Sequence, residues 1–505
     1  MVVALAAAVS GRFGALPLGI SAPAAGVLLA TMALAIGGAA LRPSPAVLAA
    51  LFAAWLGAGA FNSAIALIQV FASQWPDGDW IARSGVAGRA VGNMRQPNHL
   101  ATLLLWSAVA VVPLVEMGAL GRTRARRVAA LGLMALMVLG ITLSGSRTGL
   151  VGIGVLALWG LLDRRLSRFS RALLFAAPLL CAASWGLTSW WASSQGAHAI
   201  GAAARVGEGD LSASRFAIWR DTITLISAQP WLGVHFGEFN FAWSLTPLPN
   251  RPVAFFDHTH NLPLQLAVEL GLPLAALVLA LLGLALWQAW QRTWAVTDAT
   301  GPGLRAAFVM VLLMALHSQL EYPLWYAHFL LPTAFIWGLC LGAGAPVATA
   351  SAEARPPRWP IVVGAAMVIA AVVVLIDYRR VVIIFSPPPG AAPLEERIAD
   401  GRRSWFFAHH ADYAAATTAE RPADVMSAFQ RAPHHLLDTR LMIAWATALA
   451  QSGDVDRARH LAARLREFRN PNSDDFFAPC ADAALQPRPF QCEPPERLYT
   501  WRDFR

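Results

Sequence analysis

Long apolar runs separated by short polar segments occupy the first three quarters of the chain. A helix that crosses a hydrocarbon layer of ~30 Å needs about 20 mostly apolar residues. Runs close to this length lie at 22–41, 47–72, 98–118, 128–143, 147–162, 172–194, 262–290, 305–320, 326–346 and 359–384. The pattern predicts an all-α, polytopic membrane protein with ten spanning helices. A further run at 1–10 represents an eleventh helix but is too short to cross alone, so we expect either a truncated first helix or a misassigned start site.

The composition agrees with a membrane protein and explains the positive charge. Hydrophobic residues make up 56% of the chain and charged residues only 14%, against about a quarter in soluble proteins. All 39 basic residues are arginines, and many lie in short connections at 122–127, 164–171 and 291–305. Short Arg-rich loops stay in the cytoplasm, so the net charge of +9 reflects membrane topology and no nucleic-acid partner is expected.

Placing these Arg clusters in the cytoplasm fixes the remaining topology by alternation. Segments 73–97, 144–147, 195–261 and 317–328 then face the outer side, which is the periplasm in a Gram-negative cell. We predict a transmembrane domain over 1–384, with a large periplasmic loop at 195–261, and a small helical periplasmic domain over 385–505. Segment 438–468 has the spacing of a helix hairpin resembling one tetratricopeptide unit, which is either an appendage or a partner-binding surface.

The four cysteines fall into two groups. Cys181 and Cys340 lie within apolar runs and are expected to be small buried residues. Cys480 and Cys492 lie in the polar tail, where they predict a disulfide if the tail is exported and two free thiols if it is cytosolic. The predicted topology favours the disulfide.

Polar residues gather at the outer ends of the apolar runs, at 92–106, 144–149, 212–241, 257–261 and 317–332. A transporter would need polar residues along a path through the membrane. Clusters on one face instead predict a site that opens to the periplasm.

The segment DHTHN (257–261) is the most distinctive of these clusters. Pro263 favours a helical first turn, so a helix should begin near Asn261, with Gln265 one turn further on the same face. Such a polar stripe must face protein or water. The helix N-terminus would attract an anion beside His260, which could accept a proton from a hydroxyl.

Metal binding and helix capping are the alternatives for this segment. His258 and His260 share one side only if the chain is extended. No HExxH or CxxC motif supplies the further ligands that a catalytic zinc needs. We therefore expect no metal here.

Arginines in two other clusters are candidates for phosphate binding. Arg147 lies between two short apolar runs, where an ionisable residue is functional by default unless it reaches out to a lipid phosphate. Arg215 and Arg220 flank Trp219 in a segment that could equally be an amphipathic interfacial helix. In contrast, Asp77 and Asp79 fit a solvated turn better than a metal-binding pair, and Asn98 could simply cap a helix.

Five motifs together resemble bacterial O-oligosaccharyltransferases of the pilin-glycosylating type, within the superfamily of O-antigen ligases and polymerases. They are GNMRQPNHLATLLLW, SGSRTG, the Arg215–Trp219 segment with PWLGVHFGEFNF, DHTHNLPLQLAVELG, and HSQLEYPLWYAHFLLP. The resemblance implies a helical membrane fold of the glycosyltransferase C type in the inner membrane. It also implies that a glycan is transferred from undecaprenyl pyrophosphate to Ser or Thr of a pilin-like or other periplasmic protein.

The resemblance also implies roles for individual residues, with no cofactor and no metal. His260, Arg147 and Arg215 match the catalytic positions. The substrate-binding candidates are Gln96, Asn98, His99, Arg220, His258, Asn261, Gln265, His317, Glu321 and Tyr322. Three other functions use related chemistry or the same lipid: a lipopolysaccharide O-antigen ligase, an O-antigen polymerase, and a transporter of the lipid-linked glycan.

Overall fold

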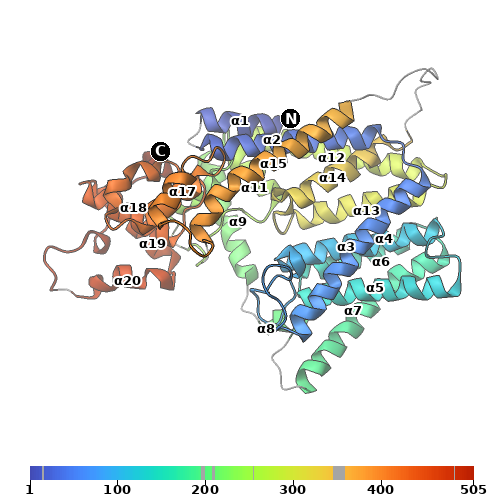
Figure 1. Ribbon diagram of the computed structural model, residues 1–505. Helices are drawn as coiled ribbons and strands as arrows, with labels where there is room; N and C mark the ends of the chain where they lie inside the picture. The colour runs from blue at the N-terminus through green and yellow to red at the C-terminus, as the bar shows by residue number, and fades with distance from the viewer. Residues whose placement is uncertain are drawn as a thin grey trace. The chain divides into compact units, whose positions relative to one another are not determined.

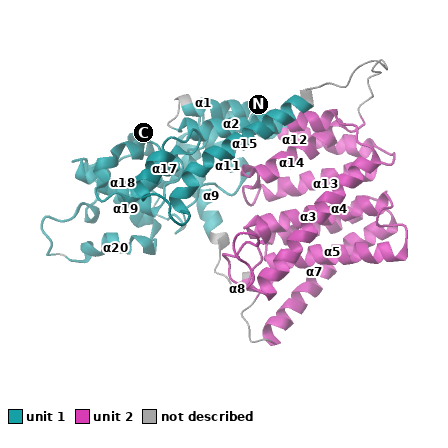
Figure 2. Cartoon of the chain, viewed as in Figure 1, with its two compact units in different colours: residues 1–32, 211–281, 355–505 teal, residues 33–210, 282–354 magenta. Residues whose placement is uncertain are grey.

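The computed structural model describes the whole chain except residues 14–15, 195–199, 208–210, 249, 254, 345–358 and 483. The described residues contain helices and no strand, which confirms the predicted all-α class. The chain forms two compact units, each made of segments that are not contiguous in the sequence (Figure 2). Unit 1 comprises Met1–Met32, Leu211–Leu281 and Arg355–Arg505, and unit 2 comprises Ala33–Asp210 and Leu282–Ala354.

Seven helices among the described residues are long and apolar enough to cross a membrane (Figure 1). They are α2 (Leu18–Ala40), α3 (Pro45–Phe71), α4 (Pro97–Glu116), α5 (Arg124–Ser144), α7 (Arg168–Ser194), α12 (Leu272–Ala295) and α15 (Trp359–Phe385). Shorter apolar helices are α1 (Val2–Phe13), α6 (Arg147–Leu162), α13 (Gly301–His317) and α14 (Ala327–Gly342). These helices match the predicted runs, with one exception.

The predicted run at 262–290 is not one helix. The chain forms α11 (Leu262–Leu270), breaks at Gly271, and continues as α12. Gly271 has a φ of +77°, and a Cβ atom there would lie 2.2 Å from the carbonyl oxygen of Trp231. The break therefore requires glycine, and it separates a short polar helix from the apolar helix that follows.

The remaining helices are short, and most belong to the tail or to the segment before α11. They are α8 (Gly201–Gly207), α9 (Leu211–Ala228), α10 (Phe239–Leu245), α16 (Leu394–Gly401), α17 (Ala408–Thr418), α18 (Thr439–Gln451), α19 (Val455–Phe468) and α20 (Asp474–Phe477). The 3-10 turns are η1 (Gly92–Met94), η2 (Pro323–Trp325), η3 (Pro422–Gln430), η4 (Ala432–His434), η5 (Pro471–Ser473), η6 (Ala478–Ala481), η7 (Phe490–Cys492) and η8 (Trp501–Phe504).

Unit 2 is a helical bundle built around α4. Of the apolar window of α4, 94% is buried, so this helix contacts protein on all sides, as a helix that is apolar all round should. α3, α5, α6 and α13 pack against it. The indole N–H of Trp106 donates to the carbonyl oxygen of Met310 at 3.0 Å, so this buried polar group has a partner.

Small residues allow helices of unit 2 to approach closely. A Cβ atom on Gly338 of α14 would lie 2.1 Å from the carbonyl oxygen of Ala35 in α2. Membrane helices commonly use small residues in this way because close backbone approach maximises van der Waals contact. In the same unit, Arg305 of α13 and Asp163, which directly follows α6, form a buried ion pair of 2.7 Å.

In unit 1 the tail packs on the segment between α9 and α11. The predicted hairpin at 438–468 forms as α18 and α19, which pack against each other. Cys480 and Cys492 form a disulfide, while Cys181 and Cys340 are buried free thiols. Both cysteine predictions are confirmed. The domain boundary at 384/385 stays a prediction.

Candidate functional site

The DHTHN segment leads directly into α11, in unit 1. Asn261 is the N-cap of this helix, and its side-chain oxygen accepts the backbone N–H of Leu264 at 3.0 Å. Pro263 lies in the first turn, where its missing N–H has no intrahelical acceptor. The predicted start of the helix at Asn261 is therefore confirmed.

The polar stripe of α11 faces protein and holds the segment before it. The buried side chain of Gln265 accepts the backbone N–H of Thr259 at 2.8 Å and donates to Glu269 at 3.0 Å. The indole of Trp219, on α9, donates to the carbonyl oxygen of Thr259 at 2.9 Å. Both backbone groups of Thr259 are thus fixed by side chains from two different helices.

His260 has a constrained backbone at the centre of this arrangement. Its φ is +54°, a left-handed conformation that costs a non-glycine residue on the order of 1–3 kcal/mol and is often found at functional sites. Its partly buried ring meets the ring of Phe256 edge-on, with 5.3 Å between centroids. The fixed Thr259 on one side and the Asn261 cap on the other keep this conformation in place.

His258 forms a pair with Asp257. Its Nδ1 lies 3.1 Å from the Asp257 carboxylate. Burial alone would raise the pKa of Asp257, but the hydrogen bond from His258 holds it below the ordinary value. Neither His258 nor His260 belongs to a group of three possible metal ligands in the described part of the chain.

The two arginines of α9 differ in their surroundings. Arg220 is exposed, and it donates to the carbonyl oxygen of Asn250 at 2.7 Å and to Asp221 at 3.3 Å. Arg215 is partly buried and lies one turn before Trp219, whose indole holds the DHTHN segment. The contacts of Arg220 link α9 to the loop at Asn250.

In unit 2, the cap of α4 is Gln96 rather than Asn98. The Gln96 side chain accepts the backbone N–H of His99 at 2.7 Å. Asn98 instead donates to the Glu321 carboxylate at 2.8 Å and accepts from the hydroxyl of Ser146 at 2.6 Å. The capping alternative for Asn98 is therefore wrong, and three segments predicted to face the same side meet at this residue.

Arg147 begins α6 beside this cluster. Ser146 is the N-cap and accepts the backbone N–H of Gly149 at 3.1 Å. Arg147 is the first residue after this cap, and its side chain is exposed. The positive end of the helix dipole and the arginine would both attract an anion here.

Histidines and aromatic residues surround Glu321 in the same unit. The His317 ring pairs with the hydroxyl of Thr102 at 2.8 Å. The ring of His99 lies 6.2 Å from that of His317 and 4.4 Å from that of Tyr326, and Tyr326 stacks on Tyr322. The predicted residues Gln96, Asn98, His99, His317, Glu321 and Tyr322 are thus neighbours in unit 2.

Sequence reasoning missed several residues that hold these segments. Buried Arg89 donates to the carbonyl oxygen of Ser144, the first residue of the SGSRTG motif, at 2.9 Å. A basic residue in an apolar, glycine-rich loop was the signal for it. Asp77 accepts three backbone N–H groups of its own turn, so the turn interpretation is confirmed.

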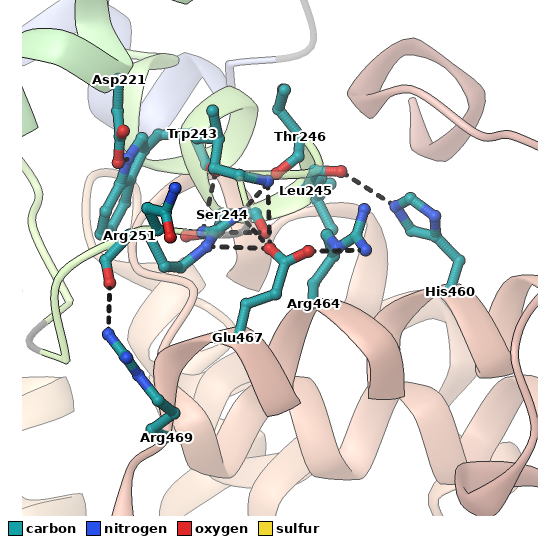
Figure 3. A network of polar contacts seen from close by, with 12 residues as sticks. Asp221, Trp243, Ser244, Leu245, Thr246, Arg251, His460, Arg464, Glu467 and Arg469 are labelled. Carbon is teal, nitrogen blue, oxygen red and sulfur yellow. Dashed lines mark hydrogen bonds and ion pairs between the residues drawn. The ribbon is translucent and has the colours of Figure 1, made fainter.

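The tail holds the segment before DHTHN, which sequence reasoning also missed. Asn240 donates to the carbonyl oxygen of Phe256 at 2.9 Å and accepts the backbone N–H of Leu437 at 2.8 Å. Fully buried Arg251 pairs with Glu467 of α19 at 3.0 Å (Figure 3). His460 of α19 also pairs with the carbonyl oxygen of Leu245 at 2.9 Å. Contacts between segments so far apart leave no trace in local sequence patterns.

Comparisons with known proteins agree with the motifs. Three family models match: protein glycosylation ligase at residues 90–114, O-antigen ligase at 132–279, and the C-terminal part of virulence factor membrane-bound polymerases at 305–475. A general O-oligosaccharyltransferase from Acinetobacter baylyi is 29% identical over 260 residues. That match covers 50% of this chain and 43% of the relative's length.

Proposed function

We propose that the chain is a protein O-oligosaccharyltransferase, because parts of it match family models of O-antigen ligases and protein glycosylation ligases and half of it is similar to a general O-oligosaccharyltransferase. It transfers a preassembled glycan from undecaprenyl pyrophosphate to a Ser or Thr hydroxyl of a pilin-like or other periplasmic protein. The enzyme lies in the inner membrane, with its site and tail on the periplasmic side. The Cys480–Cys492 disulfide supports this orientation, since disulfides persist in oxidising compartments.

The polar cluster around Asn98 is the observation that carries the proposal. Asn98 itself lies within the segment that matches protein glycosylation ligases. Its bonds to Ser146 and Glu321 join the QPNH, SGSRTG and HSQLEYPL motifs, which are far apart in the sequence. Buried polar groups are costly unless they are paired, so a cluster of this kind in a membrane bundle is expected to serve a function.

Arginine and helix termini supply what the donor needs. We assign Arg147 and Arg215 to the pyrophosphate, because planar guanidinium groups bind phosphate oxygens through paired hydrogen bonds. The pyrophosphate departs with the electron pair of its bond to the anomeric carbon. Cations that meet this developing charge lower the barrier.

His260 is assigned to the acceptor. The acceptor oxygen forms a new bond to the anomeric carbon while the bond from that carbon to the pyrophosphate breaks, and the configuration inverts. The hydroxyl proton passes to the imidazole of His260. Gln96, Asn98, His99, Arg220, His258, Asn261, Gln265, His317, Glu321 and Tyr322 are assigned to substrate binding, and no metal takes part in a step.

An O-antigen ligase or polymerase is the second candidate, favoured by the matches at 132–279 and 305–475. Purified protein in proteoliposomes with a lipid-linked glycan separates these functions. When a pilin-like protein is the only acceptor present, its mass should increase by the mass of the glycan. Lipid A–core would gain it instead if the protein were a ligase, and the lipid-linked glycan would lengthen if it were a polymerase. A glycan that crosses the bilayer without any covalent product would indicate a transporter.

A further inference from the structure

Three histidines of the tail lie together outside the residues discussed above. His409 and His410 are in the first turn of α17, and His435 directly follows η4. Their ring centroids are 4.4 Å (His409–His410), 4.4 Å (His409–His435) and 4.6 Å (His410–His435) apart. One ligand nitrogen from each ring lies within 4.8 Å of the others.

The buried member of this group has an unmet polar atom. His409 is 5% exposed, and its Nδ1 is buried without a hydrogen-bond partner. A buried polar atom without a partner destabilises the fold, so this atom has a reason to bind a ligand. A neutral imidazole offers the lone pair that a metal ligand needs.

We propose that His409, His410 and His435 form a binding site for a divalent transition-metal ion such as Zn²⁺ or Ni²⁺. Imidazole nitrogen is a preferred ligand of both ions. Zinc–nitrogen bonds of about 2.0–2.1 Å in a tetrahedral site require nitrogen atoms about 3.3 Å apart. Rotation of the three side chains would bring the nitrogen atoms to this spacing, and a water molecule would take the fourth position.

The charges around the cluster tolerate a cation. The Asp257 carboxylate acts on His435 and favours a positive charge there. A cation there would therefore gain from Asp257. Arg431 acts against it, but its guanidinium is paired with Asp412 at 2.6 Å.

The ion would join α17 to the turn that contacts the segment before DHTHN. His434, beside His435, pairs with Glu238 at 2.8 Å, and the backbone N–H of Leu437 donates to Asn240 at 2.8 Å. A metal clip at His435 would therefore stabilise the tail where it holds this loop. Its role is structural, and it adds no metal to the transfer chemistry.

Metal titration of the full-length protein tests the site. The protein is purified in detergent with a tag that contains no histidine, and it is treated with a chelator before calorimetric titration with Zn²⁺ or Ni²⁺. We expect one saturable equivalent of either ion, none for Mg²⁺, and a melting temperature that rises with ion concentration. X-ray absorption at the zinc edge should show a nitrogen shell from three imidazoles.

Two variants decide whether these histidines are the ligands. The double variant His410→Gln with His435→Gln should lose saturable binding and the thermal shift while keeping the melting temperature of the metal-free protein. If that temperature falls, His435→Gln alone is used, because its side chain is exposed. His235→Asn is the matched control, since asparagine tolerates the φ of +80° at that position, and it should bind like the wild type. No saturable binding by the wild type, or unchanged binding by the variants, would overturn the proposal.

Discussion

Removing the Glu467 carboxylate should loosen the segment that leads to DHTHN. Glu467 accepts from Arg251 and from the backbone N–H of Leu248, both at 3.1 Å. Arg251 also donates to a backbone carbonyl of the same loop, and its guanidinium lies over the rings of Trp243 and Phe468. Its side chain is 0% exposed, against 15% for Glu467. Burial lowers the pKa of Arg251 to about 10, so it remains charged at neutral pH.

The size of the effect follows from this burial. Breaking a buried ion pair by removing one partner costs about 3–5 kcal/mol, because the other charge is left without compensation. Water can reach the partly exposed position of Glu467, so we expect the lower end, about 3 kcal/mol, in Glu467→Ala. A free-energy change of 1.4 kcal/mol is tenfold, so local opening of the loop should rise by about a hundredfold.

Amide hydrogen exchange read by mass spectrometry measures this opening directly. Peptides covering 239–251 should exchange about a hundredfold faster in Glu467→Ala. Glu467→Gln should show a smaller effect, since its amide oxygen can still accept from Arg251. Glu496→Ala removes an exposed partner of Arg459 and should leave exchange of the loop unchanged. Wild-type exchange rates in Glu467→Ala would refute the reasoning.

Three other variants probe the remaining contacts. Asn98→Ala removes hydrogen bonds to Glu321 and Ser146. Because hydrogen bonds to charged groups contribute about 1.5–3 kcal/mol, the initial rate of glycan transfer should fall at least tenfold. An unchanged rate would show that Asn98 does not belong to the site. Arg147→Lys keeps the positive charge but cannot form two parallel hydrogen bonds to a phosphate. The KM for the lipid-linked donor should therefore rise about tenfold in a donor titration. A KM equal to that of the wild type would exclude pyrophosphate binding by Arg147. Cys480→Ser removes the disulfide and should destabilise the loop that it closes by about 3 kcal/mol. Limited proteolysis should then cleave the variant faster than the wild type after residue 470. Equal cleavage rates for the two proteins would contradict this.

The sequence predicted most helices because apolar runs of membrane length need no knowledge of tertiary contacts. It failed at the break in the run 262–290, because the need for Gly271 arises only when Trp231 packs against it. It also misplaced the cap of α4. The signal was present, since Pro97 follows Gln96 and proline favours the first helical position.

The candidate residues were easier to find than the contacts that hold them. His260, Asn261 and Gln265 lie close together in the sequence, so helix geometry relates them. The bond between Asn240 and Leu437 joins residues that no local pattern connects. The paired histidines at 409–410 and 434–435 are visible in the sequence, yet only folding brings His435 to the other two.

The transfer of a glycan to protein by a route that uses His260 is the central claim, and intact-mass measurement of the acceptor tests it most directly. A purified pilin-like acceptor is incubated with lipid-linked glycan and either wild-type protein or His260→Ala. Both proteins must show the same melting temperature, and an acceptor lacking its target Ser or Thr serves as the control. We predict that the mass of one glycan is added by the wild type only, and only to the intact acceptor. An equal mass gain with His260→Ala would contradict the assigned role of His260, and no gain with the wild type would contradict protein glycosylation for that acceptor.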